Sequence, residues 1–462
     1  MSSRVPTGTE ADLLVIGGGA GGLAAARTGA RLGRRVTMIQ DGPIGGDCTF
    51  TGCVPSKTLI ESAARGAGFV EAMERVRATV ARIAATETAE VLSREGVEVL
   101  EGRARFVRDR TVTVDGQEIR ARRVVIATGS APVIPSIPGL AEGPLLTNEN
   151  VFDLKEPPAS LTIVGGGPIG CELAQAFARL GVAVTLVEST SRLLPKEEPS
   201  AAELIARVLG REGVDVRLDA TVRRVERPSG AEVVLVLGDG TEIVCERVLV
   251  AVGRRPVTDG LDLEVAGVRL DERGHIRTDR HLATTASGTY AVGDVTGRLA
   301  FTHAADEMGR LAAINALRSP LLLSFKDTAS PWVIFTHPEV ARVGMSEAQA
   351  AASGGRVAVV PLSQIDRAIT AGEEEGFVKL IAGPRRVTAN LAGGRILGAT
   401  IVAPRAGEMI HEVALAMRVG AFTGRLAQTV HAYPTWSTGI RKAAAQFFFE
   451  IDGRKARPAE PG

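Results

Sequence analysis

The chain has 462 residues, and its 54 lysines and arginines against 53 aspartates and glutamates leave a formal net charge of +1. This balance disfavours a nucleic-acid partner, because bulk binding to a polyanion needs an excess of positive charge. Hydrophobic residues make up 45% and charged residues 23%, which excludes extensive disorder and is typical of a globular protein. At about 150 residues per domain, the length predicts about three domains.

No run of about 18 apolar residues occurs, so we expect no membrane span. The first residues are polar and lack the apolar core of a signal peptide, and we therefore expect a cytoplasmic protein. The chain has four cysteines: Cys48, Cys53, Cys171 and Cys245. So few cysteines in a long chain do not suit a secreted disulfide scaffold, and the close pair is more typical of a catalytic or metal site.

The N-terminal part begins with a strand, a glycine-rich loop, a helix and a second strand. The strand is predicted over Ala11–Ile16, the helix from after Gly22 to about Leu32, and the second strand over Val36–Ile39. A long helical pattern extends from about Ser56 to Arg94. Three shorter runs predict strands: Val97–Leu100, Thr111–Val114 and Val124–Ala127.

The same order of elements recurs after a linker. Proline-rich stretches at Pro132–Pro138 and Pro157–Pro158 flank the linker candidate Gly143–Asn150. The second copy consists of Leu161–Val164, Gly165–Gly170, a helix to Leu180, and Val182–Val187. Two copies of one unit indicate an internal repeat at the scale of domains. A β-hairpin is predicted next, with strands Val233–Leu237 and Ile243–Val250.

The chain from Pro331 onward alternates strand-like runs with helical ones and contains no glycine-rich phosphate loop. Strands are predicted at Val357–Val360, Phe377–Ile381 and Ile396–Val402, and helices at Glu408–Val419 and Gly439–Phe449. We interpret this part as a third, α+β domain.

Both glycine loops have the spacing Gly-x-Gly-x-x-Gly. The first consists of Gly17, Gly19 and Gly22, and the second of Gly165, Gly167 and Gly170. In such loops the first glycine turns the chain, the second lets the backbone approach a pyrophosphate, and the third lets helix and strand pack closely. The helix N-terminus then offers free N–H groups to the phosphates. The strand before and the helix after each loop favour two dinucleotide sites.

The residue that ends the second strand of such a unit binds a ribose hydroxyl. In the second unit it is Glu188, which accepts from a free 2′-hydroxyl and repels a 2′-phosphate, so we predict a preference for NADH over NADPH. Arg192 lies near enough to weaken this preference, and a capping role for Glu188 in solvent is the alternative. In the first unit this position is Gln40, whose amide oxygen can also accept a hydrogen bond from a ribose hydroxyl.

The string Gly45–Lys57 holds two cysteines at the spacing Cys-x4-Cys. Pro55, just after Cys53, predicts that Cys53 lies at or near a helix start. The helix dipole and the cation of Lys57 favour a thiolate there. A metal site and two unrelated buried thiols are the alternatives, but no second Cys/His pair at ligand spacing accompanies the string. We favour a redox-active pair.

With these motifs, the chain resembles the pyridine nucleotide–disulfide oxidoreductases over nearly its whole length. Ala127-Thr128-Gly129 resembles the junction motif of that family, and Tyr290–Asp294 its second FAD motif. The resemblance implies an α/β fold with two Rossmann-like dinucleotide-binding domains and a C-terminal α+β dimerisation domain. It places the FAD-binding domain at 1–150 and 271–328, the NAD(P)-binding domain at 151–270 and the dimerisation domain at 329–462.

The resemblance also implies the chemistry. NADH, or less favourably NADPH, reduces FAD, which passes electrons to a Cys48–Cys53 disulfide. Cys53 is expected to face the flavin and Cys48 to attack the acceptor, a small molecule or metal ion, while Glu172 pairs with Lys57 beside the flavin. A homodimer without a resident metal is expected. The implied FAD residues are Gly17, Gly19, Gly22, Gln40, Gly46, Lys57, Thr128, Gly129, Gly293 and Asp294. The implied NAD(P) residues are Gly165, Gly167, Gly170, Glu188 and Gly253.

The C-terminal motif departs from that of the disulfide reductases, which is His-x-His-Pro-Thr followed by a glutamate. Tyr433 stands in place of the catalytic histidine, and Thr438 in place of the glutamate, while His431 matches the first histidine. A tyrosine with a pKa near ~10 is a poor base at neutral pH, which disfavours efficient reduction of glutathione or lipoamide.

Mercuric reductase also carries a tyrosine in this region, and the run Glu172–Gly181 resembles that branch. That enzyme receives its metal on a vicinal cysteine pair near its C-terminus, whereas Lys455–Gly462 contains no cysteine. Capture of a soft metal would therefore rest on Cys48 and Cys53. Dihydrolipoamide dehydrogenase is the alternative assignment. A flavoenzyme that reduces quinones, oxygen or a second nicotinamide nucleotide without the cysteines, and a non-enzymatic role in sensing FAD or NAD, are the remaining hypotheses.

Overall fold

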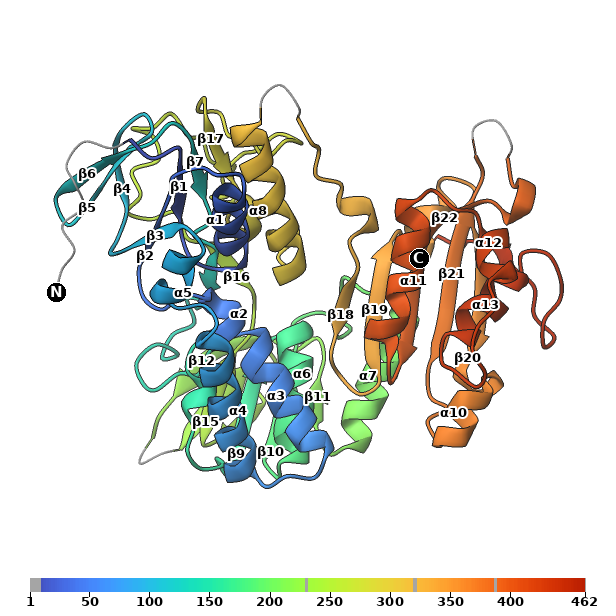
Figure 1. Cartoon of the computed structure of the whole chain (residues 1–462). Coiled ribbons are helices and arrows are strands. Elements are labelled where there is room, and N and C mark those ends of the chain that lie inside the picture. The colour runs from blue at the N-terminus through green and yellow to red at the C-terminus, as the bar shows by residue number, and fades with distance from the viewer. Residues whose placement is uncertain (1–9, 229–231, 319–321, 386–388, 462) are drawn as a thin grey trace. The chain divides into compact units, whose positions relative to one another are not determined.

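The computed structural model describes residues 10–228, 232–318, 322–385 and 389–461, so the polar N-terminal segment 1–9 lies outside the described residues. The chain forms two compact units (Figure 1). The first unit contains residues 1–135, 146–156 and 252–326, and the second contains 136–145, 157–251 and 327–462. These units do not by themselves assign cofactors to segments, so the four-segment division given above remains a prediction.

A five-stranded parallel sheet forms the centre of the first unit. Its order is β17 (Thr289–Ala291), β7 (Val124–Ile126), β1 (Leu13–Ile16), β2 (Val36–Gln40) and β3 (Val97–Glu101). Every residue of β1 is buried, with Leu13 and Val15 on one face and Leu14 and Ile16 on the other. This explains the continuous apolar run, because a parallel strand is covered on both faces. Helices α1 (Ala20–Arg31) and α8 (Thr302–Leu317) lie side by side next to this sheet (Figure 1).

The long helical pattern predicted from about Ser56 to Arg94 is helical in the structure but is not continuous. The structure has three helices in this region: α3 (Cys53–Ala64), α4 (Phe69–Ala84) and α5 (Ala89–Arg94). Gly66, at φ +74°, ends the first of them, because a positive φ cannot continue a right-handed helix. The hydroxyl of Thr88 accepts from Val91 N at 3.3 Å and caps the third. The sequence contains both signals, the glycine and the threonine. The apolar periodicity continues across them, however, and by itself predicts an unbroken helix.

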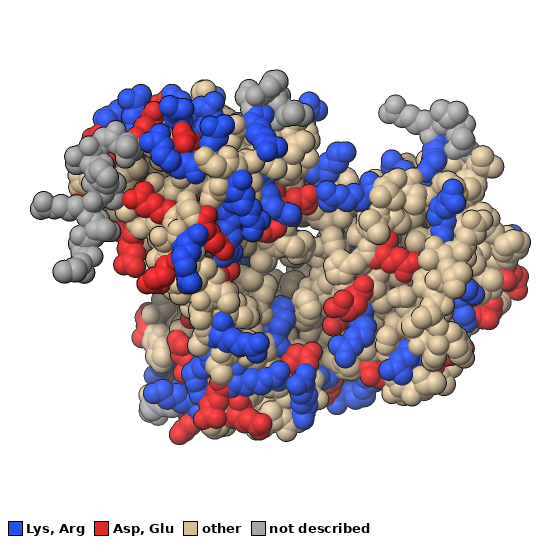
Figure 2. All heavy atoms as spheres, in the orientation of Figure 1, with Lys and Arg blue, Asp and Glu red and all other residues tan. Residues whose placement is uncertain are grey.

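Short elements complete the first unit. They are α2 (Gly46–Phe50), an antiparallel sheet of β4 (Arg105–Arg108), β5 (Thr111–Val114) and β6 (Gln117–Arg120), and an antiparallel pair of β8 (Ser130–Pro132) and β16 (Arg254–Pro256). On the face shown in Figure 2, acidic side chains lie among the basic ones, as the near-neutral charge leads one to expect.

The second unit begins with a parallel sheet in the order β11 (Asp215–Arg217), β10 (Ala183–Val187), β9 (Ser160–Val164) and β15 (Arg247–Val250). Helices α6 (Pro168–Arg179) and α7 (Pro199–Arg211) follow β9 and β10 in the chain. A small antiparallel sheet consists of β12 (Val222–Glu226), β13 (Val233–Leu237) and β14 (Glu242–Cys245).

The predicted hairpin is correct for its first half, where β13 pairs with β14. The second strand, predicted over Ile243–Val250, is in fact divided at Glu246. Beyond this residue β15 leaves the hairpin and pairs in parallel with β9. Two hydrogen bonds hold Glu246 where the chain passes from β14 to β15. Its carboxylate accepts from Ala159 N at 2.7 Å, and its N–H donates to the Ser160 hydroxyl at 3.0 Å.

A six-stranded antiparallel sheet forms the C-terminal part of the second unit. Its order is β18 (Trp332–Ile334), β19 (Glu339–Gly344), β22 (Arg395–Ala403), β21 (Phe377–Gly383), β20 (Arg356–Pro361) and β23 (Arg457–Pro458). The helices are α9 (Glu347–Ala351), α10 (Asp366–Ala371), α11 (Ala406–Arg418), α12 (Thr423–Gln428) and α13 (Thr438–Ala445). In the described part of the chain, no helix is both long enough and apolar enough to cross a membrane.

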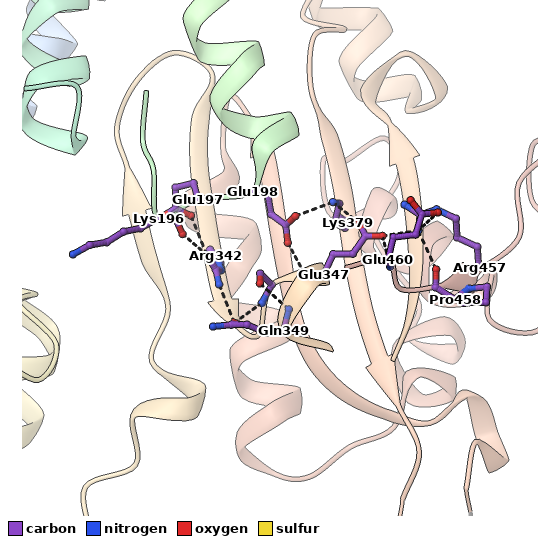
Figure 3. A network of polar contacts seen from close by, with 11 residues as sticks. Lys196, Glu197, Glu198, Arg342, Glu347, Gln349, Lys379, Arg457, Pro458 and Glu460 are labelled. Atoms are coloured by element: carbon purple, nitrogen blue, oxygen red, sulfur yellow. Dashed lines mark hydrogen bonds and ion pairs between the residues drawn. The ribbon is translucent and has the colours of Figure 1, made fainter. Parts of the chain in front are cut away.

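This sheet contains a buried network of charges (Figure 3). Lys379 of β21 is 7% exposed and donates to Glu198 at 3.0 Å and to Glu347 at 2.8 Å. Glu347 also pairs with Arg457 of β23. The network therefore joins the start of α7, the start of α9, the sheet and the C-terminal segment.

Candidate active site

The first glycine loop has no room for side chains at two of its glycines. A Cβ on Gly17, which has φ +103°, would lie 2.4 Å from Ala127 O, and one on Gly22 would lie 1.8 Å from Gly17 O. At Gly19 the nearest atom is 4.0 Å away, on Gly46. Gly19 is also the N-cap of α1 and supplies no side-chain cap, so the first N–H groups of α1 are open to an anion. The loop therefore fits a dinucleotide pyrophosphate.

Gln40 and Gly46 both contact the first glycine loop. The side-chain oxygen of Gln40 accepts from Gly18 N, and its amide group donates to Asp41 O at 2.9 Å and Pro43 O at 3.1 Å. Gln40 thus holds the loop in place. Gly46, at φ +62°, brings the start of α2 against Gly19, since a Cβ there would lie 2.9 Å from Gly19 Cα.

A second cluster surrounds Asp294, at the start of the 3₁₀ turn Gly293–Thr296. The Asp294 carboxylate accepts from Ser130 Oγ at 2.6 Å. Gly129, at φ +72°, turns the chain just before Ser130, and Thr128 donates to Val257 O at 2.6 Å. The four predicted FAD residues Thr128, Gly129, Gly293 and Asp294 therefore belong to one connected turn region. Their assignment to the flavin's ribityl chain remains a prediction.

Arg254 is a residue that the sequence did not point to. It donates to Ser130 Oγ and Ser130 O, each at 2.7 Å, and to Asn148 at 3.3 Å. It also forms an ion pair with Asp47, the neighbour of Cys48 on α2. Arg254 thereby connects the helix that carries Cys48 to the turn that carries Asp294. Only its position directly after Gly253 could have drawn attention to it.

The two cysteines lie in contact, Cys48 in the middle of α2 and Cys53 at the start of α3. Cys53 is the first residue of α3, which confirms the predicted helix start, and both cysteines are thiols in this structure. The hydrogen bond with Cys53, burial and the charge of Cys53 together raise the pKa of Cys48 far above its usual value. Cys53 is the more exposed of the two in the single chain. Their division into flavin-facing and attacking thiols remains a prediction.

The second glycine loop repeats the geometry of the first. Gly165 has φ +112°, and a Cβ on Gly170 would lie 1.9 Å from Gly165 O. No atom lies within 4 Å of a Cβ built on Gly167, the N-cap of α6. The residues therefore fit a second dinucleotide, as the repeat in the sequence predicts.

Glu188 follows β10 and is bonded to this loop. One carboxylate oxygen accepts from Gly166 N at 2.7 Å, and the other accepts from Thr190 N at 2.8 Å and from the hydroxyls of Thr190 and Ser189 at 3.0 and 3.2 Å. Burial raises the pKa of Glu188, but these hydrogen bonds outweigh burial and lower the pKa below its usual value. A negative charge therefore stands beside the loop at neutral pH.

Three further predicted site residues are divided between the two units. Lys57 lies on α3 of the first unit, and Glu172 lies on α6 of the second, where its carboxylate accepts from Phe335 N at 2.8 Å. Gly253 belongs to the first unit, and its carbonyl accepts from Val133 N at 3.0 Å. The pairing of Lys57 with Glu172 and the contact of Gly253 with NAD(P) remain predictions.

The polar side chains of the C-terminal motif have partners within the second unit. Tyr433 is 75% exposed, and its hydrogen bond to the negative Asp366 raises the pKa of its hydroxyl. The Thr438 hydroxyl donates to Thr435 O within its own turn. His431 lies between the Glu412 carboxylate, at 3.0 and 3.1 Å, and Thr429 O, at 3.0 Å. Thr438 therefore does not reproduce the role of a glutamate that orients a catalytic base.

The other two cysteines are buried, Cys171 on α6 and Cys245 on β14. Burial raises the pKa of Cys171, so this thiol is unreactive. Among the described residues, no group of three or more histidines, cysteines, aspartates and glutamates is placed to hold a metal ion.

Comparisons with known proteins agree with this geometry. Residues 11–309 match the family described as pyridine nucleotide-disulphide oxidoreductase, and residues 330–444 match its dimerisation domain. Similar curated proteins include a mercuric reductase of Bacillus cereus, 34% identical over 457 residues (94% of this chain, 71% of the relative). Another is a dihydrolipoyl dehydrogenase of Thermus scotoductus, 36% identical over 461 residues (94% of this chain, 96% of the relative).

Solved structures are similar over almost the whole chain. The HOCl-induced flavoprotein disulfide reductase RclA from Escherichia coli has a TM-score of 0.87 and 32% sequence identity, with 94% of this chain and 99% of that chain covered. The predicted family, fold class and cofactor classes are thus confirmed. The chain belongs to the pyridine nucleotide-disulphide oxidoreductases, enzymes that use FAD and NAD(P)H.

Proposed function

We propose that this enzyme passes electrons from NADH through its Cys48–Cys53 pair to a soft acceptor, in the first place a thiophilic metal ion. The observation that carries the proposal is the contact between the two thiols, Cys48 on α2 and Cys53 at the start of α3. Two adjacent sulfurs can form a disulfide, and as thiolates they can bind a soft divalent cation.

FAD, when bound by the first glycine loop and the Asp294 turn, supplies two-electron transfer between the nicotinamide and the disulfide. The Cys48–Cys53 disulfide gains two electrons and two protons and becomes two thiols. These thiols bind a divalent metal ion as thiolates and release two protons. The two sulfurs then give two electrons to the metal ion as the disulfide forms again. For a divalent metal ion the balanced overall reaction converts NADH and M²⁺ to NAD⁺, M⁰ and H⁺.

The C-terminal motif supports a metal ion over a disulfide substrate. Reduction of a disulfide needs a proton donor for the leaving thiolate and a base for the attacking thiol. Because Asp366 raises the pKa of Tyr433, this hydroxyl stays protonated and cannot serve as the base. A metal ion displaces the thiol protons directly when it binds, and its reduction has no leaving thiolate that needs a proton donor.

The similar proteins favour the same acceptor without deciding it. Several are mercuric reductases, and RclA is also known as a Cu(II) complex. Dihydrolipoyl dehydrogenase is the second candidate, because the Thermus scotoductus protein of that name covers 94% of this chain at 36% identity. If the acceptor is lipoamide, Tyr433→His with Thr438→Glu should raise the turnover, since it restores the missing pair.

We further propose that two copies of the chain form the working enzyme. The match of residues 330–444 to a dimerisation domain supports this arrangement. Val430 and Tyr433 are 90% and 75% exposed in the single chain, and we propose that this C-terminal segment completes the acceptor site of the partner subunit.

Cys48→Ser tests the proposed route. We expect Hg(II)-dependent oxidation of NADH to fall by about 100-fold or more, the scale of loss when a catalytic nucleophile is removed, while bound FAD is retained. Cys245→Ala is the matched control, because it removes a buried thiol of β14. Full activity of Cys48→Ser toward Hg(II) would contradict the proposal and favour a quinone or oxygen reductase. Comparison of Hg(II) with lipoamide as acceptor then separates the first candidate from the second.

Glu188→Ala tests the proposed preference for NADH. The carboxylate is charged at neutral pH, so it repels a 2′-phosphate, and its removal frees the N–H groups of Gly166 and Thr190. We expect the ratio of kcat/KM for NADH over NADPH to fall about tenfold, equivalent to about 1.4 kcal/mol. Because the pKa of Glu188 is lowered, its charge should not change between about pH 6 and 8, so a change in the wild-type ratio over this range would come from the 2′-phosphate of NADPH, whose second pKa is about 6. Glu226→Ala, which removes an exposed charge on β12, should leave the ratio unchanged.

A further inference from the structure

A threonine at the start of α8 lies against both thiols. Thr302 is the first residue of this 16-residue helix. Its hydroxyl donates to Cys48 Sγ at 3.2 Å and lies 3.6 Å from Cys53 Sγ. All three residues belong to the first unit, although Thr302 is 254 positions from Cys48 in the chain. A side chain from a distant segment is thus placed on the reacting atoms.

The chemistry of this contact depends on a single proton. A hydroxyl has one hydrogen, so Thr302 can donate to only one sulfur at a time. A donor stabilises a thiolate more than a thiol, because hydrogen bonds to charged groups are stronger. In agreement, the Thr302 hydroxyl acts on the pKa of Cys48 in the downward direction, against the rise caused by Cys53 and by burial.

We propose that Thr302 is a catalytic residue whose hydroxyl donates to Cys48 when this sulfur becomes the thiolate that attacks or binds the acceptor. This inference deepens the proposed function and rests on the use of Cys48 and Cys53 in the reaction. The donated hydrogen bond offsets part of the cost of charge on a sulfur that is half-buried beside a second sulfur. No atom is transferred in this step, because the hydroxyl keeps its proton.

Other charged groups near the thiols stay the same when Thr302 is changed. Asp47 lies on α2 and is paired with Arg254, Lys57 lies one turn after Cys53 on α3, and His303 follows Thr302 on α8. On the neighbouring segment after α4, Glu87 accepts from Thr49 at 3.3 Å. A shift that depends only on the hydroxyl of residue 302 therefore cannot arise from these groups.

The test compares Thr302→Val with Thr302→Ser in the reduced full-length holoenzyme. Valine has the shape of threonine without the hydroxyl, whereas serine retains the hydroxyl. Iodoacetamide alkylation of Cys48, followed by mass spectrometry over a range of pH, reports its thiolate fraction. We expect the midpoint of alkylation to rise by about one pH unit in Thr302→Val, and Thr302→Ser to remain near the wild type.

An unchanged midpoint in Thr302→Val, or an equal rise in Thr302→Ser, would overturn the inference. Thr302→Ala is read in the same way if the valine variant does not retain FAD. Alkylation needs no acceptor, so the midpoint can shift as expected even if Hg(II) proves to be the wrong acceptor. If Cys48→Ser keeps full turnover while Thr302→Val still shifts the midpoint, the proposed route fails and the effect of Thr302 on the thiol stands.

Discussion

Replacement of Lys379 by methionine is expected to destabilise the C-terminal sheet by about 3–5 kcal/mol, the usual cost of leaving a buried charge without its partner. Lys379 lies between two carboxylates that are almost inaccessible, since Glu198 is 3% and Glu347 is 8% exposed (Figure 3). Methionine fills a similar volume, so the loss comes from the two carboxylates that remain.

In Lys379→Met the two carboxylates retain different hydrogen-bond and ion-pair partners. Glu347 retains Arg457 and the N–H of Glu460 at 3.3 Å. Glu198 retains the N–H of Glu347 at 2.7 Å. The expected cost therefore falls mainly on Glu198, and Lys379→Met combined with Glu198→Met should recover stability, because an apolar pair of similar volume replaces the ion pair.

The effect should depend on pH in a defined direction. Burial raises the pKa of Glu347, but the hydrogen bonds from Arg457 and Lys379 outweigh it and lower the pKa below its usual value. A carboxyl group with a lowered folded-state pKa stabilises the fold above its unfolded pKa, and this stability is lost as the pH falls through the folded pKa. The difference between wild type and Lys379→Met should therefore narrow below about pH 4.3, the ordinary pKa of a glutamate, as Glu347 becomes protonated.

Urea unfolding followed by tryptophan fluorescence measures this effect directly. The chain has two tryptophans, Trp332 and Trp436, and both lie in the C-terminal part. Lys442→Met is the matched control, since Lys442 pairs with Asp452 with side chains 30% and 44% exposed, and such pairs contribute at most about 1 kcal/mol. Equal urea midpoints for the two variants would show that the buried network does not stabilise the sheet.

The sequence predicts the parts of this enzyme that depend on neighbouring residues. The glycine spacing, the apolar runs of β1 and β9 and the start of α3 at Cys53 are local signals, and the structure agrees with each. Where two local signals compete, prediction fails. At Gly66 the helical periodicity on both sides concealed the break, and at Glu246 the β-type run continued while its pairing changed from β13 to β9.

Contacts between distant segments could not be predicted in this way. Arg254 reaches Asp47 across 207 positions, and Thr302 reaches Cys48 across 254. Apart from the position of Arg254 directly after Gly253, nothing in the local pattern distinguishes this arginine or this threonine from others in the chain. Lys379 is different, because a lysine within the apolar run Phe377–Gly383 indicates a buried partner, although not which one.

Gly22→Ala is expected to abolish binding of FAD. A Cβ at this position would lie 1.8 Å from Gly17 O, so α1 would have to move away from the loop by more than about 1 Å in a closely packed layer. That movement would disrupt the pyrophosphate cradle. The absorbance of bound flavin in the purified protein measures the loss, and circular dichroism shows whether the remaining fold is intact.

Three further glycine variants separate the causes of this loss. Gly170→Ala makes the same overlap in the second loop, at 1.9 Å from Gly165 O, and should retain FAD while the oxidation of NADH is lost. Gly210 lies on α7, and no atom lies within 4 Å of a Cβ built on it, so Gly210→Ala should retain both bound FAD and the oxidation of NADH. Gly19→Ala meets no atom closer than 4.0 Å, so a loss of FAD there would come from the methyl group blocking the pyrophosphate. If Gly22→Ala binds one FAD per chain, close packing of α1 against the first loop is not required for binding of FAD. Residues other than these glycines would then have to determine which loop binds FAD.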